Sequence, residues 1–318
     1  MFIACVSLIL GFLLLVKGAD YFVEGASTIA KKLHIPAFIV GLTIVAFGTS
    51  APELAVSVSA AIKGSNDIAI GNVVGSNLFN LLVVLGCSAL IKPIIVEANM
   101  IKRDFPISIL VAVVLGILSL DMIYGKEAMV LGRVDGTILL VLFGLYMYIT
   151  VRLALKVRKG SQPDEEVDDD SSLLKSIIIC VLGLIGIVIG GNIAVDGAKE
   201  IARGFGLSEA FIGLTIVALG TSLPELVTSI VAAKKGKSDI ALGNVLGSNI
   251  FNVLLILGTS ATIFPMDMSS TYLYDVLILI IVSLLVFVPV FITKKVGRGL
   301  GIAMVLSYVG YTIYLFVR

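Results

Sequence analysis

Two stretches of the chain are near copies of each other, and the distance between the copies constrains the fold more than any other feature. The segment "GLTIVAFGTSAPELAVSVSA" at 41–60 matches "GLTIVALGTSLPELVTSIVA" at 213–232 in 14 of 20 positions. The segment "DIAIGNVVGSNLFNLLVVLG" at 67–86 matches "DIALGNVLGSNIFNVLLILG" at 239–258, again in 14 of 20 positions. Both pairs share an offset of 172 residues without a gap, so the chain consists of two related halves.

Composition indicates that both halves lie in a membrane. The 318 residues are 58% hydrophobic and 14% charged, with a mean hydropathy of +1.10. Soluble domains are usually about half apolar and about a quarter charged. Lysine and arginine total 23 against 22 acids, a balance that gives no reason to expect a nucleic-acid partner. The opening segment lacks the basic start of a signal peptide, and we expect it to be retained.

Ten apolar stretches are long enough for spans, which need about 20 residues each. They are 2–23, 37–61, 68–91, 105–122, 128–150, 174–195, 209–232, 240–263, 273–293 and 298–317. Each half contains five, and five is odd, so the halves enter the membrane in opposite directions. We therefore predict an all-α polytopic membrane protein of ten transmembrane helices in two inverted five-helix repeats, a plan common among secondary transporters. The repeats cover 1–151 and 174–318, and a linker covers 152–173.

Basic residues predict the orientation. Sixteen lysines and arginines follow the odd-numbered spans, whereas five lie on the other face. Cytoplasmic loops carry the excess of positive charge. We therefore expect a multi-pass protein of the cell membrane with both termini extracellular and the 152–173 linker cytoplasmic.

The first motif places polar groups beside a helix breaker. Pro52 has no N–H, and its ring clashes with the carbonyl of Gly48, so the helix must kink or break there. We expect carbonyls near Ala46, Phe47 and Gly48 to lose their partners, which membrane interiors tolerate only against protein or a water-filled cavity. If the segment is helical, Thr49, Ser50 and Glu53 share one face. The second copy supplies the equivalent residues Ala218, Thr221, Ser222 and Glu225.

The second motif adds neutral oxygen donors. Asn72, Ser76 and Asn80 are four residues apart and share a helical face, and the other copy offers Asn244, Ser248 and Asn252. Asn77 and Asn249 belong to the same polar set. The glycine pairs Gly71–Gly75 and Gly243–Gly247 have the spacing that lets helices approach closely.

The two glutamates most strongly indicate function. A charge at the bilayer centre costs at least about 2.5 kcal/mol, and no basic residue of these spans is an obvious partner. A bound cation is the natural counter-charge. The candidate ligands are all oxygens, and the one histidine, His34, belongs to a basic loop. This set disfavours zinc and copper and suits Ca²⁺, Na⁺ or Mg²⁺. Ca²⁺ is favoured because Mg²⁺ gives up its waters reluctantly, and Na⁺ would use overlapping oxygens.

The motifs "GTSAPE" and "GTSLPE", each followed by "GN..GSN.FN", resemble the two alpha-repeats of the cation/calcium exchanger superfamily, and prokaryotic sodium/calcium exchangers most of all. The resemblance implies antiport in which Na⁺ and Ca²⁺ occupy one central site alternately, while the first and sixth helices slide against the rest. It implies backbone carbonyl ligands at Ala46 and Ala218. It also implies side-chain ligands at Thr49, Ser50, Glu53, Ser76, Asn80, Thr221, Ser222, Glu225, Ser248 and Asn252.

One departure bears on the counter-ion. Sodium/calcium exchangers often carry Asp at one of the positions held here by Asn80 and Asn252, so this site has two formal charges, from Glu53 and Glu225. Proton/calcium members usually have a different motif in place of "GTS.PE", and retention of Thr and Ser in both halves favours Na⁺.

Other functions stay open at this point. The same fold could exchange H⁺ for Ca²⁺, or require K⁺ together with Na⁺, and an inverted repeat could also line a cation channel. An intramembrane hydrolase using Ser50 or Ser222 is disfavoured because no histidine or lysine lies near either serine in sequence. We therefore expect no enzyme and no cofactor. The expected partners are the lipid bilayer and the transported ions Ca²⁺ and Na⁺, and the sequence indicates no oligomeric state.

Overall fold

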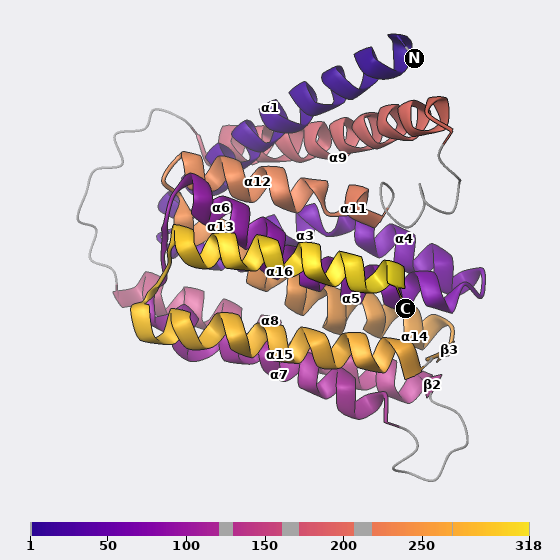
Figure 1. Ribbon diagram of the computed structural model, residues 1–318. Helices are drawn as coiled ribbons and strands as arrows, with labels where there is room; N and C mark the ends of the chain where they lie inside the picture. The colour runs from indigo at the N-terminus through magenta and orange to yellow at the C-terminus, as the bar shows by residue number, and fades with distance from the viewer. Residues whose placement is uncertain (1, 121–129, 161–171, 207–217, 269, 318) are drawn as a thin grey trace.

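The computed structural model describes residues 2–120, 130–160, 172–206, 218–268 and 270–317, most of them helical (Figure 1). The first half comprises α1 (Phe2–Lys32), α2 (Ala37–Val40), η1 (Gly41–Val45), α3 (Ala46–Thr49), α4 (Ala51–Ile62), α5 (Asn66–Phe79), η2 (Asn80–Val84), α6 (Leu85–Ile91), β1 (Ile94–Ile95), η3 (Met100–Asp104), α7 (Phe105–Leu118), β2 (Val130–Leu131) and α8 (Arg133–Gly160), where η marks π-helical turns.

The described elements of the second half follow the same order, except that η3 has no counterpart there, and the positions equivalent to α2 and η1 lie outside the described residues. It comprises α9 (Leu173–Gly204), α11 (Ala218–Thr221), α12 (Leu223–Lys234), α13 (Ser238–Phe251), η6 (Asn252–Leu257), α14 (Gly258–Ile263), β3 (Met266–Asp267), α15 (Ser270–Thr293), β4 (Lys295–Val296) and α16 (Arg298–Val317). The π-helical turns η2 and η6 begin at Asn80 and Asn252, one residue after the same Phe in each motif.

The described helices support a multi-pass membrane protein. Six helical runs are long and apolar enough to cross a bilayer, and a seventh is added if 37–49 and 51–62, bent by 48°, form one span. By length and hydropathy, the described helices therefore give fewer candidate spans than the ten predicted. Part of the difference is local: α7, on the predicted span 105–122, has 14 residues. The predicted span 209–232 lies partly outside the described residues.

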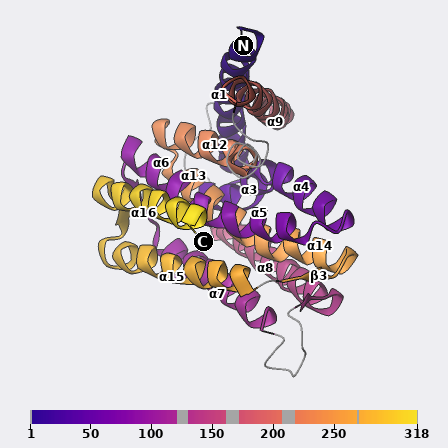
Figure 2. The same ribbon diagram turned by 45° about the vertical axis from the view of Figure 1, so that its right-hand side comes forward.

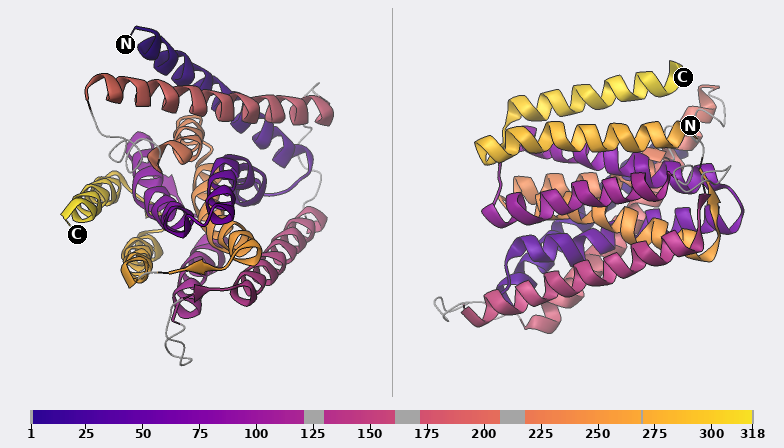
Figure 3. Two further views of the ribbon diagram at one scale, coloured as in Figure 1. Left: turned by 90° about the vertical axis from the view of Figure 1, so that its right-hand side faces the viewer. Right: turned by 90° about the horizontal axis from the view of Figure 1, so that it is seen from below.

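Helices α1 and α9 lie side by side at one edge of the bundle, across from α7, α8 and α15 (Figures 1–3). Their close approach depends on glycine. A Cβ atom at Gly183 would lie 2.5 Å from the main-chain nitrogen of Phe22, and one at Gly18 would lie 2.7 Å from that of Ile187. In each of the two helices, 28% of the 18-residue apolar segment is buried, so both helices present most of their surface outward.

The motif-bearing helices form the interior. In each candidate span we consider the 18-residue apolar segment. Of that segment, 94% is buried in the run α13–α14 and 72% in α5–α6, compared with 22% in α8. A Cβ atom at Gly247 of α13 would lie 2.7 Å from that of Ala46, so this glycine permits close contact with α3. Close packing through glycine is therefore confirmed at Gly247. Among the described residues, nothing lies within 4 Å of a Cβ atom at Gly75 of α5. Position 214, which corresponds to the Leu42 that Gly247 meets, lies outside the described residues, so close packing at Gly75 stays a prediction.

Two short antiparallel pairings join the halves. Strand β1 pairs with β4 through Ile94 and Val296, and β2 pairs with β3 through Leu131 and Met266. The offset of 172 residues maps Ile94 onto Met266, so β1 and β3 are equivalent. Each half therefore pairs its strands with those of the other half.

The predicted linker is shorter than expected at its start. Helix α8 continues to Gly160, so residues 152–160 are helical. Residues 161–171 of the predicted linker lie outside the described part of the chain.

Candidate cation site

The helix that carries the first motif breaks where the sequence predicts. Helix α3 ends at Thr49 and α4 begins at Ala51, with Ser50 between them at φ −83° and ψ 5°. Pro52 lies in the first turn of α4, where its missing N–H costs nothing. The carbonyl of Ala46, however, still accepts the N–H of Ser50 at 3.0 Å. The prediction that the Ala46 carbonyl loses its partner is wrong, because the turn before the break closes normally.

The second copy breaks in the same way. Helix α11 ends at Thr221, α12 begins at Leu223, and Ser222 between them has φ −91° and ψ 5°. Ala218, the predicted carbonyl ligand of this half, is the first residue of α11. The two breaks therefore present equivalent Thr-Ser pairs.

The two glutamates are held crosswise. The hydroxyl of Ser50 donates to Oε1 of Glu225 at 2.9 Å, and that of Ser222 donates to Oε1 of Glu53, also at 2.9 Å. Both carboxylates are fully buried. The segment that carries Thr49, Ser50 and Glu53 is not one continuous helix, because it breaks at Ser50, but all three side chains are buried against the opposite half. Each serine contacts the carboxylate of the other half, so neither half forms this arrangement alone.

Serines of the second motif extend the same network. Oγ of Ser222 also lies 2.9 Å from Oγ of Ser76 on α5. Ser248 on α13 reaches Oε1 of Glu225 at 3.5 Å. The structure therefore forms two buried hydrogen-bonded groups, Ser50–Glu225–Ser248 and Ser222–Glu53–Ser76, each with contributions from both motifs and both halves.

The threonines are tied to asparagines of the opposite half. Oγ1 of Thr49 lies 2.9 Å from Oδ1 of Asn244, and Oγ1 of Thr221 lies 3.3 Å from Oδ1 of Asn72. Nδ2 of Asn244 in turn donates to Ser229 at 3.0 Å and to the Glu225 carbonyl at 3.4 Å. Asn72 makes the equivalent bonds in its own half. These asparagines hold the broken segments against α5 and α13.

Several buried polar atoms of the two motifs have no hydrogen-bond partner. Within the described part of the chain, Oε2 of Glu53, Oε2 of Glu225 and Oδ1 of Asn252 are buried and accept no hydrogen bond, and neither side-chain polar atom of Asn80 has a partner. An unsatisfied buried polar atom costs about 1–3 kcal/mol, and more when it is charged. No Lys or Arg among the described residues forms an ion pair with either glutamate. A cation bound among these oxygens would supply both the missing contacts and the missing charge.

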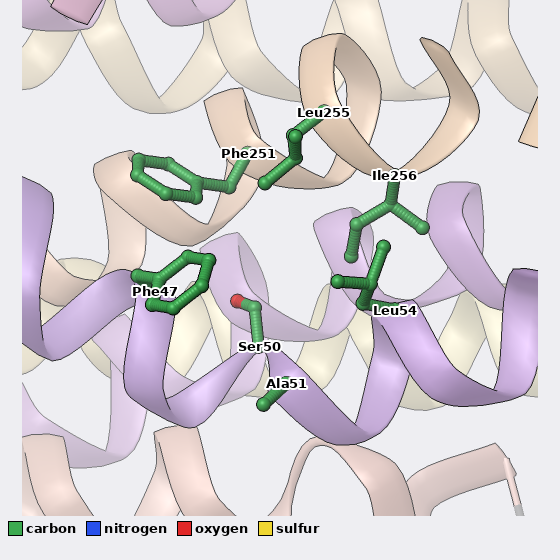
Figure 4. Close-up of a pocket in the computed structure, with 7 residues that line it drawn as sticks. All are labelled: Phe47, Ser50, Ala51, Leu54, Phe251, Leu255 and Ile256. Atoms are coloured by element: carbon green, nitrogen blue, oxygen red, sulfur yellow. The ribbon is translucent and has the colours of Figure 1, made fainter. Parts of the chain in front are cut away.

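A small cavity adjoins Ser50 (Figure 4). It has a volume of about 10 Å³, and its walls are apolar apart from Ser50: Phe47, Ala51, Leu54, Phe251, Leu255 and Ile256. The rings of Phe47 and Phe251 lie 6.1 Å apart between centroids. This volume holds at most about one water molecule. A hydrated cation therefore cannot reach Ser50 from this side unless these side chains move.

The sequence assigned no role to a second reciprocal pair. Nδ2 of Asn77 donates to the main-chain carbonyl of Asn249 at 3.2 Å, and Nδ2 of Asn249 donates to that of Asn77, also at 3.2 Å. The available signal was that both asparagines fall at the offset of 172. The sequence also missed Asp104, which is fully buried and paired with Arg103 at 2.7 Å.

Comparison with protein families places these motifs in a known group. The family model "Sodium/calcium exchanger protein" matches residues 3–152 and again 175–317, one match to each half. The putative antiporter CaxA of Alkalimonas amylolytica is 38% identical over 99% of both chains. The inner membrane protein YrbG of Escherichia coli is 35% identical over 99% of this chain and 98% of its own.

Archaeal exchangers are similar in sequence and structure. The sodium/calcium exchanger MaX1 of Methanosarcina acetivorans is 35% identical over 97% of both chains. The solved structure of the sodium-calcium exchanger NCX_Mj, soaked with zero Na⁺ and Ca²⁺, is 34% identical with a TM-score of 0.84, over 97% of this chain and 98% of its own.

Proposed function

We propose, from the premise that the chain belongs to the sodium/calcium exchanger family, that it is a secondary active antiporter that exchanges Na⁺ for Ca²⁺ across the membrane. The observation that carries the proposal is the crosswise contact of Ser50 with Glu225 and of Ser222 with Glu53. This arrangement gathers two buried carboxylates and neutral oxygens in one place. Each carboxylate and the serine that donates to it belong to different halves. A movement of one half against the other would therefore alter the whole site.

The composition of the site fits alternating occupancy. Two carboxylates neutralise one Ca²⁺, and hydroxyl, amide and carbonyl oxygens complete the flexible all-oxygen shell that Ca²⁺ accepts. Na⁺ would bind to overlapping oxygens and displace Ca²⁺. We propose as ligands Glu53, Glu225, Thr49, Ser50, Thr221, Ser222, Ser76, Asn80, Ser248 and Asn252, with the carbonyls of Ala46 and Ala218.

We further propose ten transmembrane helices in two inverted repeats, with the site at the midplane. Three reciprocal features support this symmetry: the crossed serine–glutamate contacts, the exchanged strand pairings and the Asn77–Asn249 pair. Alternating access would move the packed pair α1 and α9 against the other helices, as in transporters in which one bundle rocks around a fixed site. The termini would be extracellular. The inward Na⁺ gradient would drive Ca²⁺ out of the cell.

The test is ⁴⁵Ca²⁺ uptake into proteoliposomes loaded with Na⁺, in a Na⁺-free, pH-clamped exterior. We expect uptake that requires internal Na⁺ and is lost in Glu53→Gln, because the carboxylate is the counter-charge of the ion. Ca²⁺ flux that needs no counter-ion gradient would contradict antiport and indicate a channel.

Proton coupling is the second candidate, and the neutral side chains of Asn80 and Asn252 favour it, because Glu53 and Glu225 are then the only carboxylates among the proposed ligands. In that case the glutamates would carry H⁺ in exchange for Ca²⁺. Uptake indifferent to Na⁺ and driven by an imposed pH gradient would establish this alternative. Adding K⁺ on either side tests a K⁺-dependent exchanger.

A further inference from the structure

The two asparagines that begin the π-helical turns are not equivalent, although the sequence repeats them. Nδ2 of Asn252 donates to Oδ1 of Asn77 at 3.0 Å. The equivalent contact, from Asn80 to Asn249, is absent: within the described residues neither polar atom of Asn80 has a partner, and Oδ1 of Asn249 has none. The exchange of hydrogen bonds between the halves is therefore unequal at this position.

The orientation of the Asn252 amide follows from a chain of fixed contacts. The main-chain carbonyl of Asn249 can only accept, so Asn77 must direct its Nδ2 toward it, at 3.2 Å. Oδ1 of Asn77 then faces the other way, and Asn252 must direct its own Nδ2 toward that oxygen. The remaining atom, Oδ1 of Asn252, is buried without a partner. The chain begins at a backbone carbonyl, which cannot exchange roles, so the amide orientations are not interchangeable.

The freed oxygen belongs to the proposed ion site. Asn252 lies four residues after Ser248, whose hydroxyl reaches Glu225. We propose that Asn77 is a positioning residue that holds the Asn252 amide with its oxygen available to the cation and its NH₂ group turned away. The proposal rests on the proposed function and adds to it an asymmetry between the half-sites: the amide of Asn252 is fixed, whereas that of Asn80 can rotate.

The orientation matters because an amide presents either attraction or repulsion to a cation. Its oxygen is a ligand, and its NH₂ group carries partial positive charge. A freely rotating Asn252 would spend part of its time with NH₂ toward the site and would lose ordering entropy when it binds the ion. Preorganisation by Asn77 removes that cost. Asn77 therefore acts on cation affinity through Asn252 and needs no contact with the ion.

The chain supplies a matched control. Asn77→Ala and Asn249→Ala each remove one reciprocal amide–carbonyl bond of 3.2 Å, but only Asn77→Ala also releases Asn252. The readout is the Ca²⁺-dependent rise in melting temperature of the purified protein, titrated with Ca²⁺ in a Na⁺-free buffer. This readout requires binding and no transport. We expect about tenfold weaker apparent Ca²⁺ affinity in Asn77→Ala, and affinity within about twofold of the wild type in Asn249→Ala.

A double-mutant comparison tests that the effect passes through Asn252. Asn252→Ala should weaken Ca²⁺ binding, and adding Asn77→Ala to it should weaken binding no further. Equal losses in Asn77→Ala and Asn249→Ala, or additive losses in the double variant, would overturn the proposal. If Asn77→Ala does not fold, Asn77→Asp retains the oxygen that accepts from Asn252 and should show no tenfold loss, and such a loss would overturn it as well. A wild type that no cation stabilises would instead refute the proposed function.

Discussion

At the scale of single residues, the proposed cation binding depends on the burial and the contacts of the two glutamates. Glu53 and Glu225 are fully buried, each receives a serine hydroxyl from the opposite half, and each has one carboxylate oxygen that accepts no hydrogen bond among the described residues. Ionising both carboxylates without a cation would place two uncompensated negative charges in the interior, which is unfavourable. A cation bound between them would remove that cost.

Removing one charge should stabilise the ion-free protein. Glu53→Gln retains an oxygen that accepts from Ser222 and cannot ionise, so we expect the free energy of unfolding in chelator to rise at a pH at which the buried carboxylate would ionise. The same variant should lose its stabilisation by Ca²⁺. Thermal melting with chelator and with excess Ca²⁺ measures both quantities. A variant that melts lower in chelator and is still stabilised by Ca²⁺ would exclude Glu53 from the site.

The serine contacts should affect affinity more than folding. Ser222→Ala removes the hydroxyl that lies 2.9 Å from both Glu53 and Ser76. We expect the Ca²⁺ KM to rise about tenfold, which corresponds to about 1.4 kcal/mol for one lost contact. Ser88→Ala is the control, because the Ser88 hydroxyl is equally buried but bonds only the Val84 carbonyl of its own helix. Initial rates of Na⁺-dependent uptake measure KM, and similar values in the two variants would count against the crossed site.

Sequence alone located these residues but not their partners. The repeated Thr, Ser and Glu were identified because polar residues that recur at equivalent positions in two apolar spans indicate a functional site. The partners could not be predicted, because helical spacing relates residues of one segment, whereas Ser50 bonds Glu225, 175 positions away. Asn77 was missed as a positioning residue for the same reason, since its contacts to Asn249 and Asn252 cross between the halves.

At the scale of elements, the pairing of α1 with α9 is the most specific packing feature. It brings backbone against backbone at glycine, so the two helices should behave as one body when the site opens. The spacing of these glycines was not interpreted from the sequence, because a close contact is recognisable only when both helices are placed.

A methyl group at this contact should be costly. In Gly183→Ala the new Cβ atom would lie 2.5 Å from the Phe22 nitrogen and 2.7 Å from the Gly18 carbonyl oxygen, and rigid backbone must shift to admit it. Overpacking of this kind costs about 1–3 kcal/mol. A Cβ atom at Gly144 in α8 would meet no described residue within 4 Å, so Gly144→Ala should be neutral or slightly stabilising. The melting temperatures of Gly183→Ala and Gly144→Ala are compared in the same detergent. Equal values would mean that α1 and α9 are not tightly packed in the protein.

At the scale of the whole molecule, the apolar stretches predicted a helical multi-pass membrane protein, and the sequence did not predict the strands that connect its halves. Within the described residues the predicted spans are mostly helical, but 128–150 includes strand β2 (Val130–Leu131), and 105–122 extends past the end of α7 at Leu118. The two-residue strands β1 to β4 have no recognisable sequence pattern. They join the halves, and of the four strands only β1 and β3 lie at positions equivalent by the offset. The residues between 207 and 217, which contain the start of the second copy of the first motif, lie outside the described residues.

The inverted arrangement makes a prediction about sidedness. In a variant without Cys5, Cys87 and Cys180, we place single cysteines at Lys63 and Lys295, both exposed in the structure. Lys63→Cys should react with a membrane-impermeant maleimide in intact cells, because it follows an even-numbered span. Lys295→Cys should react only after permeabilisation. Labelling of both from outside, or the reverse pattern, would contradict the proposed topology.

The central claim is that Ca²⁺ and Na⁺ compete for one site built by both halves. The most direct measurement is equilibrium ⁴⁵Ca²⁺ binding to the purified protein over a series of Na⁺ concentrations at fixed pH, with Glu53→Gln and Glu225→Gln alongside. The account predicts that Na⁺ raises the apparent Kd for Ca²⁺ without lowering the number of Ca²⁺ ions bound at saturation, and that either variant abolishes binding. Ca²⁺ affinity that is independent of Na⁺, or that survives in both variants, would contradict it.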